Sequence, residues 1–395
     1  MQARFLFCNK RTVGDPQRHE ALSASQRFGI VPQAWLESQL DSRFVTAFKG
    51  LENFKLVEPD DFVISLRSFQ GGIEHSAHEG LISPAYTVMR PLGRVGPHYY
   101  RHYLKSNEFI SRLNAVTTGI REGKTIKYDE FAQLELPVPP RATQAAIADF
   151  LDRKTAAIDA LIEKKERMIE LLGEKRAALV HRAVTKGLDP NVPMKDSGVP
   201  WIGEIPAHWK LSKVKNELEN LNYRRIPLST SERNHRQGPY PYYGASGIID
   251  SVDDYIFDET AILIAEDGAN LVLRNLPLAI VARGKYWVNN HAHILRVRSG
   301  LVTFWANLVE ILDYRPFISG SAQPKLTSEA LGNIQVGIPG SLEEGLHIEA
   351  ALARVGKEYS VPIERTSLQV QRLKEYRQAL ITQAVTGQLE IPDAA

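Results

Sequence analysis

Residues 139–188 decide the fold, and they read PPRATQAAIADFLDRKTAAIDALIEKKERMIELLGEKRAALVHRAVTKGL. Apolar residues recur in this stretch at spacings of three, four and seven, which places them on one face of a helix. The other positions mix acidic and basic residues, as on a solvated helix face. A helix of about 40 residues spans roughly 60 Å. The stretch therefore predicts one long helix with a single apolar stripe, formed by Ile147, Leu151, Ile158, Leu161, Ile162, Met168, Ile169, Leu172 and Leu179.

A second helical stretch, residues 339–389, repeats this pattern. Ile348 follows Ile147 by 201 residues, and the ending ALVHRAVT at 178–185 is matched by ALITQAVT at 379–386. This period is much longer than the repeats of solenoids or propellers, so it indicates two copies of a domain followed by a helix. Two helices with one apolar stripe each can bury it against one another, most simply as an antiparallel pair.

Two considerations leave the pairing of these helices open. Each helix could instead pack only on its own domain. In addition, Pro362 stands where the first stretch has Leu161. Proline inside a helix removes a hydrogen bond and bends the helix.

The remaining sequence predicts a mixed α/β (α+β) fold with a pseudo-two-fold internal repeat, in which two domains are separated by two long antiparallel helices. Apolar and β-branched runs predict strands at 62–66, 86–89, 261–265, 278–281 and 294–297, and helical spacing predicts helices at 99–116 and 304–312. The predicted boundaries are 1–141 for the first domain, 142–187 for the first long helix, 188–209 for a linker with a lead-in segment, 210–340 for the second domain and 341–389 for the second long helix.

The linker contains several prolines and glycines and two tryptophans, Trp201 and Trp209, which we expect to pin it onto the second domain. At the offset of the long helices, Trp209 corresponds to residue 8. The first domain therefore has no matching lead-in, so either the sequence starts late or the first copy never had this segment.

Composition limits the class of protein. The chain has 395 residues, enough for two or three domains, with 43% apolar and 24% charged residues, as in ordinary globular proteins. No apolar run approaches the ~20 residues of a membrane span, and the N-terminus lacks a signal-peptide pattern. The single cysteine, Cys8, cannot form an internal disulfide. We expect a cytoplasmic protein without membrane contact. A net charge of +2 is too small to indicate nucleic-acid binding, so a DNA surface would need local patterning.

No catalytic motif stands out. Residues 119–125, GIREGKT, resemble a phosphate-binding loop, but only three residues separate the glycines, and the second copy has no such motif. His291 and His293 could face one side of a strand, but we interpret them as surface residues rather than metal ligands. Neither a nucleophile elbow nor the cofactor and target-base motifs of an adenine methyltransferase are found. The sequence therefore predicts no catalysis, no metal and no cofactor in this chain.

Basic, amide, hydroxyl and aromatic residues do interleave on predicted loops. These side chains hydrogen-bond to base edges and phosphates, although a structural role remains open for each of them. Lys124 and Lys325 also recur before the long helix in both copies, as phosphate contacts or as solvated loops. The candidate DNA-binding residues are Arg67, Gln70, Ser83, Tyr86, Arg121 and Lys124 in the first domain, and Tyr243, Ser246, Asn290, His291, Gln323 and Lys325 in the second.

Taken together, these features resemble the specificity subunit of a type I restriction-modification enzyme, and the resemblance covers nearly the whole chain. It rests on the two domains that each end in a long helix and on several short stretches. These are IADFLD at 147–152, WIGEIPAHW at 201–209, FQGG at 69–72, SPAY at 83–86, YYGASG at 242–247, EDG at 266–268 and the endings at Thr185 and Thr386.

The resemblance implies that each variable domain is a target-recognition domain that reads one half of a bipartite site in double-stranded DNA. It also implies that the paired helices set the spacing and dock two methyltransferase (modification) subunits. S-adenosylmethionine would belong to those partners, and restriction (translocase and nuclease) subunits would join for cleavage. This chain would be a non-catalytic subunit.

Other classes remain open. A non-catalytic protein-binding scaffold would bind its partners with little dependence on salt, whereas phosphate contacts make DNA affinity fall steeply with salt. An inactive truncated copy would leave DNA methylation unchanged. An enzyme with an unrecognised site, such as a nuclease, would turn over DNA with a divalent metal.

Overall fold

A computed structural model of the chain describes residues 1–25, 28–40, 53–65, 72–116, 126–320 and 324–391. The chain forms two compact units, Met1–Glu166 with Ser367–Ala395, and Arg167–Thr366. The units divide both long helices, whereas the predicted boundaries separate the helices from the domains. The reason is that each core continues from a domain into parts of both helices.

The two long helices are α5 (Arg141–Lys186) and α11 (Leu342–Val385). In the first unit they run antiparallel, because Asp159 pairs with Arg377 and Glu166 pairs with Lys374, each at 2.8 Å. In the second unit, Lys175 of α5 lies 5.9 Å from the ring centroid of Tyr359 of α11. The antiparallel pair is therefore confirmed, and the alternative in which each helix packs only on its own domain is wrong.

Two details of α11 differ from expectation. The helix continues through Pro362, so this proline does not end it. The helix ends at Val385, before the predicted end at Leu389, and the chain that follows buries Ile391.

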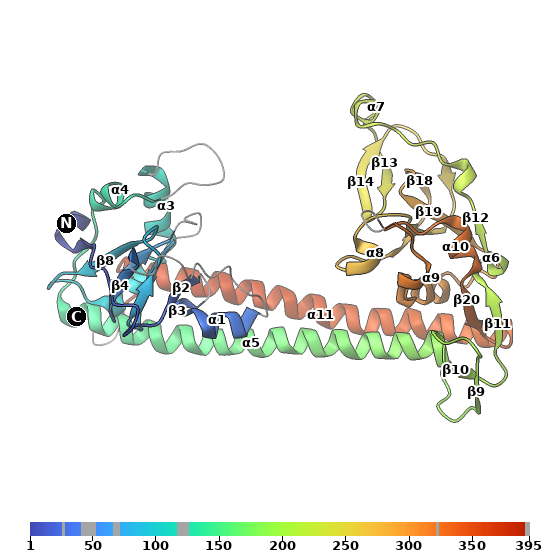
Figure 1. The fold of residues 1–395 in the computed structure, drawn as a ribbon, viewed down its shortest axis with the longest axis horizontal. Coiled ribbons are helices and arrows are strands. Elements are labelled where there is room, and N and C mark those ends of the chain that lie inside the picture. The colour runs from blue at the N-terminus through green and yellow to red at the C-terminus, as the bar shows by residue number, and fades with distance from the viewer. Residues whose placement is uncertain (26–27, 41–52, 66–71, 117–125, 321–323, 392–395) are drawn as a thin grey trace. The chain divides into compact units, whose positions relative to one another are not determined.

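The first unit contains short strands and small helices on the first half of α5 and the last part of α11 (Figure 1). Its elements before α5 are η1 (Ala3–Phe5), β1 (Phe7–Lys10), β2 (Leu22–Ser25), β3 (Gly29–Pro32), α1 (Gln33–Leu40), β4 (Lys55–Val57), β5 (Phe62–Ile64), β6 (Ile73–His75), β7 (Gly80–Ile82), β8 (Thr87–Pro91), α2 (Pro97–Tyr103), α3 (Asn107–Val116) and α4 (Tyr128–Ala132).

The second unit is richer in strands. Its elements between the long helices are β9 (Met194–Asp196), β10 (Glu204–Pro206), β11 (Lys210–Lys213), α6 (Val214–Glu217), β12 (Leu218–Asn220), η3 (Asn222–Arg224), α7 (Thr230–His235), β13 (Tyr240–Gly244), β14 (Gly247–Val252), β15 (Phe257–Asp258), β16 (Ala261–Ala265), α8 (Asn270–Leu273), β17 (Ala279–Ala282), β18 (Lys285–Val288), β19 (Ala292–Val297), α9 (Val302–Ile311), η4 (Arg315–Phe317), α10 (Ser328–Asn333) and β20 (Gln335–Ile338).

The two units share one sheet topology. The central sheet of the first unit has the order β1-β8-β5-β6, and that of the second has the order β12-β19-β16-β17, with antiparallel pairing throughout. In both units a helix follows the sheet, namely α2 or α9, and a short helix, α4 or α10, precedes the long one. The repeat predicted from the long helices thus extends to the fold of both domains.

The correspondence near the start of each domain differs from the predicted one. Gln2 pairs with Glu135, and Lys213 pairs with Gln335, its counterpart at the offset of 200. Lys213 follows Gln2 by 211 residues, so the assignment of Trp209 to the position of residue 8 is wrong. Between these pairs the first domain has 11 more residues than the second, 133 positions from Gln2 to Glu135 against 122 from Lys213 to Gln335, which explains the larger offset at the start.

The predicted strands are found within a few residues of their expected positions, at β5, β8, β16, β17 and β19. The helix expected at 99–116 is instead two helices, α2 and α3, separated at Leu104–Ser106. The Ser106 hydroxyl accepts a hydrogen bond from the Phe109 backbone N–H, which begins the second helix. Helical spacing continues across this break, so the sequence pattern did not show it.

The 188–209 segment is more ordered than a simple linker, because it forms the hairpin β9–β10. Trp209 is fully buried, and its Nε1–H donates to Glu344 at the start of α11 at 2.8 Å. Trp201 is half-exposed and meets the ring of Phe317 edge-on, with 5.2 Å between ring centroids. Trp209 therefore fixes the lead-in segment, and Trp201 covers a neighbouring surface.

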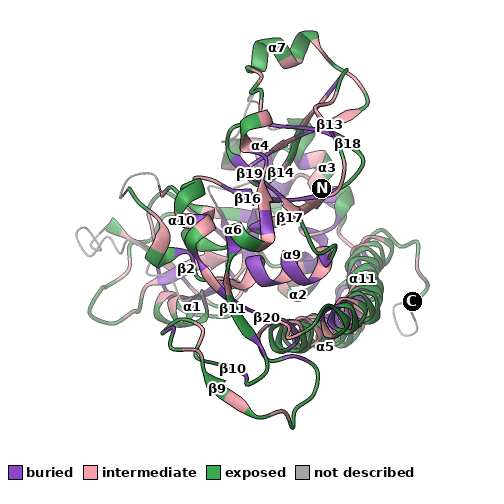
Figure 2. Ribbon diagram, turned by 90° about the vertical axis from the view of Figure 1, so that its right-hand side faces the viewer, coloured by how far each residue is buried: buried purple, intermediate pink, exposed green. Residues whose placement is uncertain are grey.

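Each core lies between a sheet and the long helices. In the first unit, aromatic rings of Phe7, Phe62, Tyr100 and Phe131 meet edge-on. In the second unit, residues of β16, α9 and β20 share one apolar cluster with both long helices. Much of the long-helix surface remains exposed (Figure 2). The domains are thus built onto the helices by continuous cores.

Candidate nucleic-acid interface

Three segments of the second unit meet at one edge of its central sheet. β16 ends at Ala265, which pairs with Ala292 at the start of β19. The Glu266 N–H therefore donates to the His291 carbonyl at 2.8 Å, and the Leu326 N–H donates to the Glu266 carbonyl at 2.8 Å. Loops at 266–268, 289–291 and 324–326 are held together by these backbone bonds.

Arg225 and Glu266 form the centre of this edge. The Arg225 guanidinium donates to Glu266 at 2.7 Å and to the carbonyls of Asn290 and Ala292 at 3.1 and 2.8 Å. Burial alone would raise the pKa of Glu266, but hydrogen bonds and charge from Arg225 and Lys325 hold that pKa below its usual value. Glu266 is therefore an ionised anchor that positions the surrounding loops.

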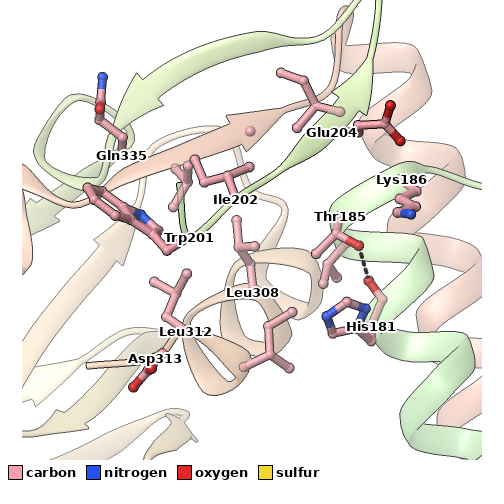
Figure 3. Close-up of a pocket in the computed structure, with 15 residues that line it drawn as sticks. His181, Thr185, Lys186, Trp201, Ile202, Glu204, Leu308, Leu312, Asp313 and Gln335 are labelled. Atoms are coloured by element: carbon pink, nitrogen blue, oxygen red, sulfur yellow. Dashed lines mark hydrogen bonds between the residues drawn. The ribbon is translucent and has the colours of Figure 1, made fainter. Parts of the chain in front are cut away.

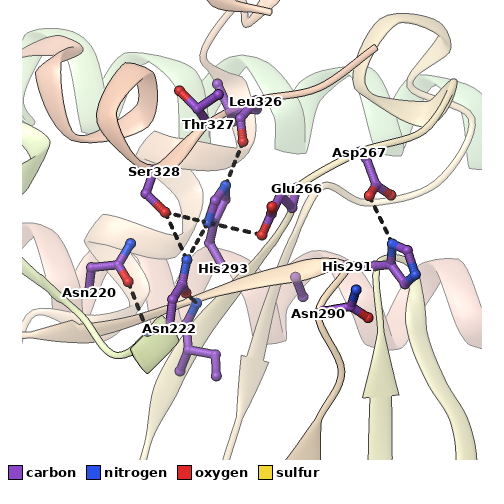
Figure 4. Close-up of polar contacts among 12 residues, drawn as sticks. Asn220, Asn222, Glu266, Asp267, Asn290, His291, His293, Leu326, Thr327 and Ser328 are labelled. Atoms are coloured by element: carbon purple, nitrogen blue, oxygen red, sulfur yellow. Dashed lines mark hydrogen bonds and ion pairs between the residues drawn. The ribbon is translucent and has the colours of Figure 1, made fainter. Parts of the chain in front are cut away.

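Two predicted site residues contact Glu266 or its neighbour Asp267. Lys325 is exposed, with its ammonium 3.2 Å from Glu266. His291 is exposed, and its Nδ1 lies 2.8 Å from a carboxylate oxygen of Asp267. Asn290 is also exposed. It directly precedes His291 in the chain, and its carbonyl accepts the hydrogen bond from Arg225. Figure 4 shows the side chains of Glu266, Asp267, Asn290 and His291.

His293 belongs to the interior, so its interpretation as a surface residue is wrong. It is fully buried, its Nε2–H donates to the Leu326 carbonyl at 2.7 Å, and its Nδ1 accepts from the Asn222 amide at 2.7 Å (Figure 4). Burial lowers the pKa of His293 below its ordinary value. The ring is a neutral structural link between β19 and the start of α10. His291 precedes β19 and lies outside the strand, so the side-chain alternation of β19 does not place it on the face of His293.

Tyr243 and Ser246 lie on the neighbouring hairpin β13–β14. The Tyr243 carbonyl accepts from the Asn289 N–H at 2.9 Å, which joins this hairpin to the 289–291 loop. Ser246 is exposed in the turn before Gly247, whose φ of +131° is one that glycine adopts readily. Burial raises the pKa of Tyr243, so its hydroxyl remains protonated and can donate. The structure thus brings Tyr243, Asn290, His291 and Lys325 onto connected loops.

In the first unit the structure describes two predicted site residues, Ser83 and Tyr86. They form a turn before β8, in which the Tyr86 N–H donates to the Ser83 carbonyl at 3.0 Å. The Lys55 ammonium donates to the Tyr86 carbonyl at 2.6 Å. This turn occupies the position of the 289–291 loop in the second unit, because β8 corresponds to β19. The remaining candidates Arg67, Gln70, Arg121, Lys124 and, in the second unit, Gln323 lie outside the described residues.

The sequence did not single out Arg225 or Asp267 as site residues. An arginine bound to two backbone carbonyls leaves no local sequence pattern, because its partners lie 65 and 67 positions away. Glu266-Asp267-Gly268 was noted only as a stretch, since nothing in the sequence connects it with His291.

One pocket of the second unit lies apart from this polar edge. A pocket of about 190 Å³ lies between the end of α5, the β9–β10 hairpin, α9 and β20, with a largely apolar lining that includes Val184, Ile202 and Leu308 (Figure 3). Within the described residues, no group of three or more His, Cys, Asp or Glu side chains could hold a metal ion. Among the described helices, none is long and apolar enough to cross a bilayer.

The polar edge lies within a segment that resembles a known domain family. Residues 206–366 match the family model of the type I restriction modification DNA specificity domain. Residues 206–366 thus carry the sequence pattern of this DNA specificity domain. The match includes the whole sheet and the connected loops of the second unit.

The curated relatives resemble only part of the chain. A protein of Haemophilus influenzae named as a type I restriction enzyme specificity subunit is 35% identical over 136 residues, which are 34% of this chain and 33% of that protein. The EcoKI specificity subunit of Escherichia coli is 27% identical over 134 residues, 32% of this chain and 29% of that subunit. The chain thus spans about a third of the length of the curated relatives it matches.

The fold is also found in a solved structure. A chain from work on complex assembly and conformational transition of the type I R-M system matches with a TM-score of 0.58 and 17% identity, over 85% of this chain and 84% of that one. This match confirms the mixed fold of domains and long helices. It gives no information on individual site residues.

Proposed function

We propose that the chain is the DNA-binding specificity subunit of a type I restriction-modification complex, in which each domain reads one half of a bipartite target. The observation that carries this proposal is the exposed set Ser246, Asn290, His291 and Lys325, together with the half-buried Tyr243, on connected segments that match a DNA specificity domain. Such amide, imidazole, hydroxyl and ammonium groups bind base edges and phosphates.

The first domain would read the other half with the corresponding loops. Ser83 and Tyr86 stand before β8, as Asn290 and His291 stand before β19. In the sequence, Arg67 and Gln70 stand between β5 and β6, as Glu266 and Asp267 stand between β16 and β17. The same edge of one fold with different side chains suits two readers of different sequences.

The long helices would dock two methyltransferase subunits. Four large apolar side chains of α5 remain exposed beside its pairing with α11. Where such exposed apolar side chains form a contiguous patch, the patch marks a surface for a partner. The exposed residues are Leu161, Met168, Leu171 and Leu179.

Catalysis would belong to the partners of this chain. S-adenosylmethionine would bind to the methyltransferase subunits, and restriction subunits would join them for cleavage. This chain would contribute recognition and assembly, and it would need no cofactor of its own.

The exposed apolar residues on α5 also favour a second candidate, a protein scaffold that does not touch DNA. If the chain binds DNA, its own domains determine which sequence the partners modify. If the chain is a scaffold, the partners determine that sequence themselves. A scaffold leaves that sequence unchanged when its domains are exchanged.

The test is single-molecule sequencing of modified adenines in the host genome, with and without the gene. We expect methylation of a split motif to disappear on deletion. Exchange of residues 210–340 for the equivalent domain of another family member should change only one half of the motif. Methylation that is the same with and without the gene contradicts the proposal.

A further inference from the structure

We propose that His291 accepts a hydrogen bond from the exocyclic amino group of one base, adenine N6 or cytosine N4, in the half-site of the second domain. This inference rests on the proposed DNA-binding function. It adds to that function the chemical group that one side chain recognises.

The hydrogen position on the His291 ring follows from its partner. Nδ1 lies 2.8 Å from Oδ2 of Asp267. An ionised carboxylate can only accept, so Nδ1 carries the hydrogen, and Nε2 of the neutral ring presents a lone pair. Within the described residues, no hydrogen bond reaches Nε2 of this ring. An exposed, oriented acceptor results.

Backbone hydrogen bonds fix both members of the His291–Asp267 pair. The His291 N–H donates to Oδ1 of Asn289 at 2.8 Å, and its carbonyl accepts from Glu266. Asp267 forms a backbone bridge with Lys325, and the Gly268 N–H donates to the Pro324 carbonyl at 3.0 Å. A reader fixed by such supporting bonds discriminates better than a mobile side chain.

The nearby His293 has the opposite tautomer, because its hydrogen-bond partners differ from those of His291. His293 donates from Nε2 to a backbone carbonyl and accepts at Nδ1, whereas His291 donates from Nδ1. His293 is buried inside the domain, and His291 is exposed at its edge. The acceptor on Nε2 of His291 is therefore specified by Asp267 and is not a general feature of this loop.

The major groove offers complementary groups. Adenine N6 and cytosine N4 are donors there, whereas guanine N7 and O6 and thymine O4 are acceptors. An acceptor on His291 can pair with the first two and is repelled by the others. Asn290, exposed beside it, has both a donor and an acceptor for a neighbouring group.

The test measures the binding of the full chain to a DNA duplex with the motif that is found methylated in the genome. It is a double-mutant cycle in which one change is made in a base and the other in the protein. Each adenine of the half-site is replaced in turn by purine, which lacks the N6 amino group, and each cytosine by 2-pyrimidinone, which lacks the N4 amino group. One analogue should weaken binding of the wild-type chain by about threefold to tenfold. The same analogue should have no additional effect on the His291→Ala variant. Weakened base pairing is common to both proteins and cancels in the cycle.

The analogue that shows the coupling identifies the base, adenine or cytosine. Asp267→Asn tests the positioning role of the carboxylate without removing the ring. An amide can donate to Nδ1 or accept from it, so this variant should lose most of the coupling although His291 is present. His235→Ala, which removes an exposed ring on α7, is the matched control and should keep the coupling.

Two outcomes overturn the inference while the proposed function stands. Equal weakening of every duplex by His291→Ala, with a smaller salt dependence, assigns the ring to a phosphate. Unchanged affinity for all duplexes shows that the ring faces away from DNA. Absence of any DNA binding by the wild-type chain overturns the proposed function itself.

Discussion

The carboxylate of Glu349 on α11 accepts a hydrogen bond from the backbone N–H of Phe304 in the first turn of α9, at 2.7 Å, and a second from the neighbouring Thr303 N–H at 2.8 Å. In the first unit, Gln144 on α5 accepts from the Gly96 N–H at the start of α2 at 2.6 Å. Each long helix therefore caps the helix that follows the sheet. The internal repeat therefore includes this capping contact, which glutamine makes in the first unit and glutamate makes in the second.

Removal of this cap should destabilise the second unit. Glu349→Ala leaves two backbone N–H groups without their charged acceptor, and we expect a loss of roughly 2 kcal/mol in the free energy of unfolding. Denaturant unfolding of the full chain measures it. Glu358→Ala, at an exposed position of the same helix, is the control. Equal small effects of both substitutions contradict the cap.

The two tryptophans of the lead-in segment should differ in their effect on stability. Trp209→Ala leaves a cavity and removes one of the hydrogen-bond donors to Glu344, so we expect a loss of about 3 to 5 kcal/mol. Trp201→Ala removes a half-exposed ring and should cost much less. Unfolding monitored by circular dichroism compares the two variants, because each substitution also changes the tryptophan fluorescence. Similar losses would show that both rings pin the segment.

Acid should weaken the second unit through His293. Burial lowers the pKa of this ring in the folded chain, so below about pH 6.5 the unfolded chain binds the proton more readily. Stability therefore falls as the pH falls from 7 to 5. Hydrogen exchange of the β16 and β19 amides, corrected for intrinsic rates, measures this loss.

His293→Asn should lower stability at pH 7 but reduce the slope with pH in these strands. His102 in the first unit also has a pKa lowered by burial, so the first unit should keep its own pH dependence in this variant. An unchanged slope in β16 and β19 would rule out His293 as its source.

Lys325 should behave as a phosphate contact. Lys325→Gln removes one cation, so DNA affinity should fall on all sequences alike, and the slope of log affinity against log salt should shrink by about one. Fluorescence anisotropy at several salt concentrations measures both quantities. Lys285→Gln, an exposed lysine elsewhere on the second domain, is the matched control. A loss confined to one motif would assign Lys325 to base recognition instead.

Local periodicity predicted much of the fold. The long helices and the strand Ala261–Ala265 followed from spacing and β-branched runs, because those signals lie within a few neighbouring residues. The order of the sheets could not be predicted, since the pairing of Phe62 with Met89 depends on contacts distant in sequence.

The candidate site was predicted in residue type and less well in geometry. Asn290, His291 and Lys325 were chosen as exposed polar residues, and the structure places them on joined loops. The sequence could not separate His291 from His293, because it did not show that β19 begins at Ala292, between the two residues. Arg225 was missed because its partners are backbone atoms of a distant loop.

The division of the chain has a consequence for its biosynthesis. Residues Arg167–Thr366 form one continuous compact unit, whereas the first unit combines Met1–Glu166 with Ser367–Ala395. The ribosome releases the continuous unit complete, while the unit that begins the chain still lacks its last helix. The Tyr99 hydroxyl, for example, must wait for the Val385 carbonyl to which it donates at 3.1 Å. The domain made first is thus completed last, and part of its surface stays uncovered until residues 367–391 have been synthesised.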